Sequence, residues 1–525
     1  MRKWTVLVIL AAIQMLLSLD TMLMSVSISA ITEDLQTNIT AVQAVITVYA
    51  LLIAALLITA GRLGDHIGLR RLLAIGLGLR ILGGLISAFA PTILVFAAGE
   101  SLIEALGAVL IIPASVAILA STYQGHDRAK AFGMLSASTA MAIALGPIVG
   151  GWLTTEFSWR YAFAGEAVVA AALLTCVRFL PRSDATKSES GFDWLGVLLT
   201  ASGMALVVLG FQRASIWGWI ENNDSPITPF GLALTPFVVL GGAACLGVFA
   251  VTQQSRSRRD LPVLIDPKMF GRRYLRPSLL STMASQTVAV GLLFAILLYL
   301  QTVLGYSALA SGLALLPMAV SSFVASLLWP KLSRILSPRA ISLIGMGLLA
   351  SAAAVLYWSV SPRVSGNPFL LAAALLGLSL GLLTSQLSAV SQGAVLEDAR
   401  GSVGGVHFTA HGLGTALGPA IVGTVVIAGL ASAMSGLVQS APGLRVETRQ
   451  LANLKIERNL PFLSQSEAAR AVSNLGIPKQ DAAQVLALYQ RAELVALENG
   501  ALVAGMIALA GAAFAFALPK KRPEP

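Results

Sequence analysis

Fourteen long apolar segments run through this chain of 525 residues, and each is long enough to cross a lipid bilayer. A helix of about 20 apolar residues spans the hydrocarbon core, and its backbone polar groups are satisfied within the segment. The chain is therefore expected to be an all-α membrane protein with fourteen transmembrane helices. The expected spans lie near 5–27, 41–60, 71–90, 93–120, 129–153, 161–180, 194–211, 229–252, 277–303, 308–330, 339–360, 368–393, 402–434 and 495–518.

The composition excludes a soluble protein. Hydrophobic residues make up 56% of the chain and charged residues only 11%, whereas soluble domains carry roughly 25% charged residues. Cys176 and Cys245 fall in or near apolar runs, which indicates packing thiols and gives no basis for a disulfide. The apolar run that follows Met1-Arg2-Lys3 continues to about Ile28, too far for a signal peptide, and is interpreted as a retained first span.

The distribution of basic residues predicts the orientation. If both termini are cytoplasmic, that side holds 24 of the 35 lysines and arginines. The short outer loops hold three, Arg160, Arg213 and Arg363, while seven lie in one long outer segment and Arg80 lies within the third span. This asymmetry follows the positive-inside rule and accounts for the net charge of +10 without a nucleic-acid partner. We expect a multi-pass protein of a bacterial-type inner (plasma) membrane.

Two internal echoes indicate that the chain consists of two related halves. The strip 61–76, GRLGDHIGLRRLLAIG, returns 269 positions later at 330–345 as PKLSRILSPRAISLIG. Each strip joins the end of one apolar run to the start of the next. A second echo links Gly146-Pro147 to Gly418-Pro419, which are 272 positions apart. Repeats of this size are typical of membrane transporters built from two halves.

The echoes and the polar linkers divide the chain. We expect an N-terminal six-span bundle over 1–180, linkers and an inserted span pair over 181–276, and a C-terminal six-span bundle over 277–525. The segment 435–494 is expected to form a small helical cap on the outer face. Within it Ser464 to Glu467 resembles a capping box, and a second helix is expected to start at about Lys479 and run into the last span.

Two motifs resemble signatures of the major facilitator superfamily. The first lies between spans two and three, and in the family it is implied to lock the switch between outward-open and inward-open states. It comprises Gly61, Gly64, Asp65, Gly68, Arg70 and Arg71. The second lies in span five and resembles the motif that marks antiporters. It comprises Gly133, Ala142, Gly146, Pro147, Gly150 and Gly151, and span thirteen repeats it at Gly414, Gly418, Pro419 and Gly423. Small residues four apart permit close helix packing. In the second copy of the first motif Arg334 and Ser337 replace Asp65 and Gly68, so the gating latch is placed in the first copy.

Further passages resemble the fourteen-span drug:proton antiporter family of this superfamily. They are Leu19-Asp20-Thr21, Phe192-Asp193-Trp194-Leu195-Gly196 and the stretch from Leu300 to Pro317. The resemblance implies the major facilitator fold, with two six-helix bundles and an inserted helix pair. One departure concerns span four, where the family pattern of roughly Arg-x-x-Gln-Gly-x-Gly reads Ser101 to Gly107. Serine replaces an arginine that is implied in proton coupling.

Charged residues inside the spans are the candidates for proton coupling and substrate binding. A charge at mid-bilayer costs roughly 2.5–3.5 kcal/mol on insertion scales, so it should face water or a partner. Glu100 and Glu104 share one helix face, and two ionised carboxylates that close repel each other, which favours proton exchange. Alternatives stay open for several groups: a structural ion pair for Asp20 and Arg80, interfacial solvation for Glu100 and Glu166, and satisfied hydrogen bonds for the histidines. The candidates are Asp20, Glu100, Glu104, Glu166, Arg80, His407 and His411.

These observations predict a transporter and not an enzyme. The leading hypothesis is a proton-driven multidrug efflux antiporter that exports amphipathic, cationic or neutral, compounds by alternating access. Lipid or glycolipid export by the same fold is the alternative. An intramembrane metal enzyme using Glu100, Glu104, His407 and His411 is a remote one, since no HExxH motif is present. The expected partners are a small amphipathic substrate, protons and membrane lipids. No nucleic acid, cofactor or resident metal is expected, and the chain is expected to act as a monomer.

Overall fold

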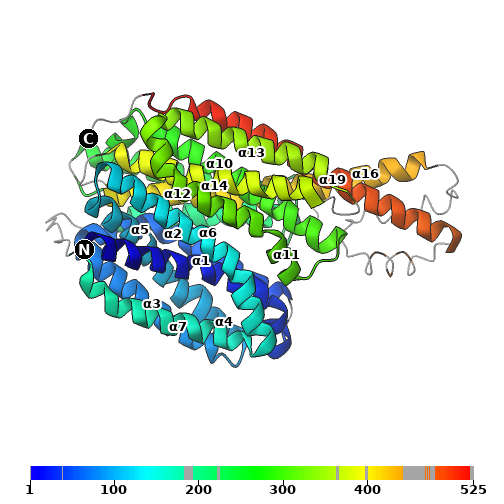
Figure 1. Ribbon diagram of the computed structural model, residues 1–525, viewed down its shortest axis with the longest axis horizontal. Coiled ribbons are helices and arrows are strands. Elements are labelled where there is room, and N and C mark those ends of the chain that lie inside the picture. The colour runs from blue at the N-terminus through cyan, green and yellow to red at the C-terminus, as the bar shows by residue number, and fades with distance from the viewer. Residues whose placement is uncertain are drawn as a thin grey trace.

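The structure, a computed structural model, is a bundle of long helices in two halves (Figure 1). It describes residues 2–37, 39–181, 193–220, 225–259, 261–361, 366–395, 400–441 and 479–520, together with 468, 470 and 472. Within these residues no β-strand occurs. The start of α1 and the end of α19 lie at the same end of the bundle, and α16 and α19 project beyond its opposite end.

The first half consists of six long helical segments. The fourth of them is continuous, but it contains one turn of π-helix, η1, between two α-helical parts. The segments are α1 (Arg2–Asp34), α2 (Ile39–Ile67), α3 (Leu69–Ala88), α4 (Ile93–Ala97) with η1 (Ala98–Glu104) and α5 (Ala105–Thr122), α6 (Gly125–Glu156) and α7 (Trp159–Cys176), which ends in the 3₁₀ turn η2 (Val177–Phe179).

The inserted pair and the second half follow. The inserted pair is α8 (Trp194–Trp217), the turn η3 (Pro229–Gly231) and α9 (Thr235–Arg258), and a linker with the turn η4 (Pro267–Gly271) follows it. The second half contains α10 (Leu275–Leu298) with η5 (Tyr299–Val303), α11 (Ala308–Ala314), α12 (Leu316–Ile335), α13 (Pro338–Ser359), α14 (Gly366–Gly393), α15 (Arg400–Gly418) with η7 (Pro419–Gly423) and α16 (Thr424–Ser440), and α19 (Lys479–Ala515). The expected start of the last helix at Lys479 matches this structure. The capping box at 464–467 and most of the linker at 181–193 lie outside the described residues.

Side-chain caps define several helix starts. Thr92, Ser158 and Ser337 each accept a backbone N–H of the first turn of α4, α7 and α13, respectively. Asp193 caps α8 in the same way, accepting from Gly196 N. Such caps satisfy amide groups that the helix itself leaves unpaired.

Helix packing repeats between the halves as the sequence echoes predict. In the first half α1 packs on α6 and α3 packs on α7 and α5, and in the second half α10 packs on α15 and α13 packs on α19 and α14. The halves meet through α2 against α15 and α6 against α12, which are also equivalent pairs. The second half has an apolar core of its own, whereas the core of the first half extends across the interface to Trp329 of α12 and Ile341 of α13. The arrangement is that of two related six-helix bundles joined by an inserted pair.

Twelve helices in the described part of the chain are long and apolar enough to cross a membrane. They correspond to twelve of the predicted spans. The helices at the positions of predicted spans five and ten, α6 and α12, are not among the twelve. The protein is thus a multi-pass membrane protein, while the count of fourteen stays a prediction.

Candidate functional site

Arg80 lies at the centre of a buried cluster of carboxylates in the first half. Its side chain is 1% exposed, and its Nη2 atom lies 2.7 Å from Glu104 Oε1, 3.2 Å from Asp20 Oδ2 and 3.3 Å from Glu166 Oε2. The three acids come from η1, α1 and α7, and Arg80 comes from α3. Residues far apart in the sequence therefore meet at one nitrogen atom. We call Arg80, Asp20, Glu104 and Glu166 the acid cage.

Two further side chains complete its surroundings. Tyr49 of α2 donates a hydrogen bond from its hydroxyl to Asp20 Oδ2 at 2.9 Å. Glu100, 2% exposed, approaches Glu104, and Glu166 approaches Asp20 in the same way. Asp20 Oδ1, Glu100 Oε2 and Glu166 Oε1 are buried and accept no hydrogen bond from the residues that the structure describes. Carboxyl groups so close to each other are stable when they share protons.

Close packing of α3 places Arg80 within reach of η1. A Cβ atom at Gly83 would lie 2.8 Å from both Glu104 N and Gly99 O, and one at Gly107 would lie 2.8 Å from Arg80 Cγ. Glycines at these contacts let the two backbones approach more closely than any side chain would permit. The π-helical turn carries both Glu100 and Glu104, and such turns are frequent at functional sites.

The charge balance of the cluster decides its chemistry. Four buried carboxyl groups, Asp20, Glu100, Glu104 and Glu166, face one guanidinium, so full ionisation would leave three uncompensated negative charges. Buried charge without a partner is costly, and the group is neutralised instead. Oxygen atoms of Asp20, Glu104 and Glu166 lie within 4.8 Å of one another, a spacing that a metal ion could use. Arg80 Nη2, however, already lies within 3.3 Å of all three carboxylates. A proton is the cation that these groups can take up while Arg80 stays in place.

The two histidines lie in the other half. His407 and His411 belong to α15, and His407 is buried, with its Nδ1 atom 3.0 Å from Ser391 Oγ of α14. Ser391 Oγ lies in turn 3.1 Å from Ser278 Oγ of α10. The structure thus brings five of the seven candidate residues together and places His407 in a hydrogen-bond chain within the second half.

The gating motif joins α2 to α3 at the end of the bundle where the chain termini lie. Gly68 is the N-cap of α3 and has a φ of 90°, a conformation that side chains disfavour. Its echo partner Ser337 is the N-cap of α13 and instead uses its side chain to accept from Ala340 N. Partial burial and, secondarily, the Arg62 guanidinium lower the pKa of His66. The side chain of Asp65 lies outside the described residues.

The glycines of the antiporter motif lie on contacts between helices. Gly133 of α6 faces α12 of the other half, and a Cβ atom at this position would lie only 2.6 Å from Ser326 O. Gly150 faces Leu23 of α1. In the second copy Gly418 faces Thr287 O of α10, so the copies pack on equivalent helices, and the Pro419 turn is π-helical.

Comparisons with known proteins identify the fold. The model of the Major Facilitator Superfamily matches residues 10–419 of this sequence. The chain belongs to this superfamily. Several of its relatives are named as drug or antibiotic resistance and efflux transporters. The puromycin resistance protein pur8 of Streptomyces alboniger is 29% identical over 81% of this chain and 82% of its own length. The multidrug efflux pump LfrA of Mycolicibacterium smegmatis is 28% identical over 81% of each chain.

One further relative matches over the whole chain, and solved structures share its fold. The tetracenomycin C resistance and export protein of Streptomyces glaucescens is 26% identical over 100% of this chain and 93% of its own length. Among solved structures, the human organic anion transporter MFSD10 has a TM-score of 0.54 at 17% identity, covering 81% of this chain and 92% of its own. The proton:xylose symporter XylE has a TM-score of 0.53 at 16% identity, with coverages of 79% and 86%. These structures share the fold, and the superfamily consists of transporters and not enzymes.

Arg80, the buried arginine beside Asp20, lies on α3 and not in span four. Ser101, where the sequence departs from the expected span-four pattern, donates a hydrogen bond to Val45 O of α2 at 2.7 Å. The guanidinium beside Asp20 comes from Arg80 of α3 instead. The departure at Ser101 and the presence of Arg80 are each visible in the sequence, but nothing in the sequence pattern connects them. The role of Tyr49 could not be predicted, because a tyrosine in an apolar helix carries no signal of its partner.

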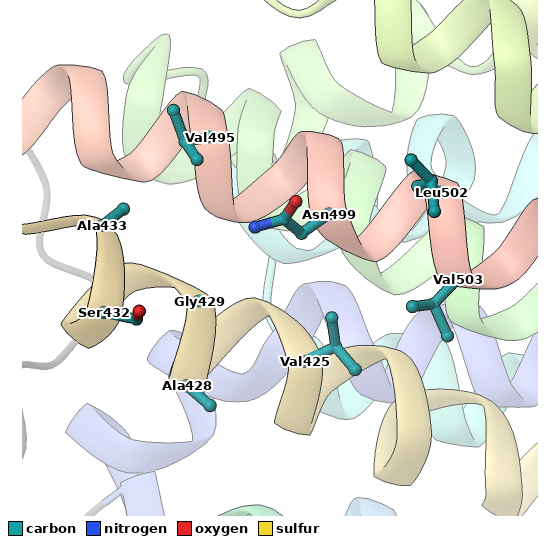
Figure 2. Close-up of a pocket in the computed structure, with 9 residues that line it drawn as sticks. All are labelled: Val425, Ala428, Gly429, Ser432, Ala433, Val495, Asn499, Leu502 and Val503. Atoms are coloured by element: carbon teal, nitrogen blue, oxygen red, sulfur yellow. The ribbon is translucent and has the colours of Figure 1, made fainter. Parts of the chain in front are cut away.

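A groove of about 560 Å³ lies apart from the acid cage, between α16 and α19 (Figure 2). All of its lining residues are uncharged, and most are apolar. They are Val425, Ala428, Gly429, Ser432, Ala433, Val495, Asn499, Leu502 and Val503. On the neighbouring side the two helices pack closely, since a Cβ atom at Gly429 would lie 3.4 Å from Ala496 Cα.

Proposed function

We propose that this protein is a proton-driven efflux antiporter that exports amphipathic, cationic or neutral, compounds by alternating access. The observation that supports it most is the acid cage, in which one arginine pairs with three carboxylates and can neutralise the charge of only one. The relatives named for resistance to puromycin and for multidrug efflux support the substrate class. The chain would act as a monomer in a bacterial-type plasma membrane, with both termini in the cytoplasm.

Protons would enter the cage from outside and leave it toward the cytoplasm. Asp20 is our first candidate for the exchanging acid, because one of its oxygens receives donors from both Arg80 and Tyr49 while the other receives none from the described residues. Glu100 and Glu104 form the second candidate site. When a proton leaves, Arg80 stabilises the carboxylate that remains. His407 and His411 stay candidates for substrate contacts in the second half.

A cationic substrate fits this scheme because it and the proton compete for the same negative charge. A compound that displaces a proton from the cluster takes over its electrostatic role, so proton and substrate bind alternately. An exchange of one proton for one monovalent cation moves no net charge and is driven by the pH gradient, whereas a second proton adds about 2.3 kcal/mol per 100 mV of membrane potential. The gating motif at Gly61–Arg71 would hold the cytoplasmic side closed while the cage faces outward.

Purified protein in liposomes with an acidic interior tests this proposal. In a one-to-one exchange a gradient of one pH unit supports up to about tenfold accumulation of a cationic dye such as ethidium, corresponding to about 1.36 kcal/mol. We expect the wild type to accumulate the dye until a protonophore collapses the gradient, and Asp20→Asn to lose this accumulation because its amide takes no proton.

The matched control is Asp34→Asn. Asp34 also pairs with an arginine of the first half, Arg160 at 2.9 Å, but both side chains are partly exposed at the outer end. We expect this variant to keep gradient-driven uptake. Undiminished accumulation in Asp20→Asn would contradict the proposed role of the cage. Gradient-driven movement of a fluorescent lipid without any uptake of dye would favour lipid export instead.

A further inference from the structure

Helix α2 contacts the acid cage with one part of its length. Tyr49 donates its hydroxyl hydrogen bond to Asp20 Oδ2, and Val45 O accepts the hydrogen bond from Ser101 in the π-helical turn. Arg80 supplies the other hydrogen bond to Asp20 Oδ2 among the described residues. The hydroxyl of Tyr49 therefore links α2 directly to the carboxylate of Asp20.

The same helix closes against the second half nearer the chain termini. A Cβ atom at Gly405 of α15 would lie 3.3 Å from Ile58 Cα and 3.4 Å from Leu57 O, so the two backbones are almost in contact. Ile58 also belongs to an apolar cluster with Val403 and Val406 of α15. Tyr49 and Ile58 are nine residues apart on one unbroken helix, about 14 Å at the usual rise per residue. A shift of α2 at Tyr49 therefore reaches the α15 contact.

We propose that Tyr49 is a positioning residue that couples the charge of Asp20 to the closure of α2 against α15. This inference rests on the proposed antiport function. With Asp20 ionised, the tyrosine hydroxyl is held by a charged acceptor, and α2 is fixed in the position that closes the cytoplasmic side. With Asp20 protonated, the acceptor is neutral, the hydrogen bond weakens and α2 is free to leave α15. Hydrogen bonds to charged groups are roughly twice as strong as neutral ones.

Few charged or titratable groups surround the contact between Tyr49 and Asp20, as the helices that pack against α1 and α2 show. Asp20 is surrounded by the acid cage, by Glu100 and by Tyr49, while α5, which packs on α1 and α2, carries no ionisable residue. The ionisable residues of α6 lie in its first two turns and at its last position. The helices α15 and α8, which also pack on α2, contribute Arg400, His407, His411 and Arg213.

Transport of a cationic dye as a function of pH tests the link, with Tyr49→Phe as the variant and Tyr299→Phe as its control. Tyr299 is a buried tyrosine of the second half whose hydroxyl donates to Ser361 O at 2.8 Å, so both variants lose one hydrogen bond. Loss of a donor to an ionised carboxylate favours its protonated form. We expect the pH of half-maximal transport to rise by about one unit in Tyr49→Phe, a shift that matches one hydrogen bond to a charged group. It should stay unchanged in Tyr299→Phe.

Reactivity of a thiol in the α2–α15 contact provides a second readout that a merely structural role would not move. Val403, fully buried in this contact, is replaced by cysteine after the native Cys176 and Cys245 are changed to serine. Labelling with a maleimide should rise as the pH falls in the parent. In Tyr49→Phe we expect labelling to be high already at alkaline pH, and its response to pH to fall to less than about half.

Each outcome decides. A shifted transport profile together with a blunted labelling response in Tyr49→Phe alone supports the link. Identical behaviour of the two tyrosine variants overturns it. If Tyr49→Phe does not fold, Asp20→Asn in the Val403→Cys background takes its place, and labelling that stays low at every pH overturns the link. If Asp20→Asn loses dye accumulation while Tyr49→Phe keeps the wild-type pH profile and labelling response, only this inference is refuted. If Asp20→Asn keeps its dye accumulation, the proposed function is refuted.

Discussion

Replacing Arg80 with methionine should make the stability of this protein depend on pH in a way that the wild type does not. Arg80 Nη2 lies within 3.3 Å of three buried carboxylates. Removing one partner of a buried ion pair costs roughly 3–5 kcal/mol, because the other charge is left without compensation. The folded variant can avoid this cost only by holding one more proton than the folded wild type.

The size of the effect follows from proton linkage. In the unfolded chain the carboxyl groups are equally ionised in both proteins between pH 5.5 and 8. One additional proton in the folded variant therefore makes its unfolding free energy fall, relative to that of the wild type, by about 1.36 kcal/mol for each unit of rising pH. Over this interval the difference grows by about 3.4 kcal/mol. The variant should be close to the wild type in stability at pH 5.5 and clearly less stable at pH 8.

Denaturation in mixed micelles at several pH values, followed by tryptophan fluorescence, measures this difference. The control is Arg160→Met, which breaks the ion pair with Asp34 at the end of α1 remote from the chain termini, together with hydrogen bonds to Ala88 O and Ala90 O. Its loss of stability should not vary over the same pH interval. If the destabilisation of Arg80→Met is equally independent of pH, the reasoning is refuted. The acid cage would then not take up a proton in place of the lost guanidinium charge.

Two further substitutions test the packing that positions these groups. Gly83→Ala should lower the unfolding free energy by about 1–3 kcal/mol and reduce gradient-driven transport, because its Cβ atom would lie 2.8 Å from Glu104 N. Gly78→Ala, which has open space around it, should do neither. Equal melting temperatures of the two variants would contradict this. Asp193→Ala should destabilise the inserted pair by about 2–4 kcal/mol, since it removes the cap of α8 and leaves the buried Gln253 amide without its acceptor. Asp193→Asn keeps the cap and should fall between the alanine variant and the wild type in thermal unfolding, and the reverse order would count against the assigned contacts.

The helices and their repeat could be predicted from the sequence because hydrophobicity and internal echoes are local signals. The echo of 61–76 in 330–345 predicted that α2–α3 and α12–α13 would be equivalent, and the mirrored packing of the halves confirms it. The difference between the copies also has a structural counterpart. Gly68 and Ser337 cap equivalent helices by different means, one through its positive φ and the other through its side chain.

The members of the acid cage could be selected from the sequence, but their arrangement could not. The cost of burying charge singles out Asp20, Glu104 and Arg80 as residues that need a partner. Which partner each one finds depends on how α1, α3, η1 and α7 cross, and no pattern along the chain encodes those crossings. The interfacial alternative for Glu166 illustrates the limit. The sequence places this residue near a helix end, whereas the structure buries it to 4% exposure beside Arg80.

The close approach of α3 and η1 was likewise invisible in the sequence. Glycines occur throughout the chain, and only the structure shows that Gly83 and Gly107 lie where the backbones meet. The π-helical turn inserts one residue into a regular repeat, and a helical pattern assumes that none is inserted. Both features bring Glu104 to Arg80, so the central contact of the cage depends on details that periodicity does not record.

Proton release upon substrate binding tests the central claim most directly. Purified protein in a weakly buffered detergent solution at about pH 7 is mixed with a cationic dye, and a pH indicator follows the solution. If the acid cage holds a proton that the substrate displaces, the wild type acidifies the solution in proportion to the dye bound, and Asp20→Asn releases less. Binding of the dye by the wild type without any release of protons would contradict the account.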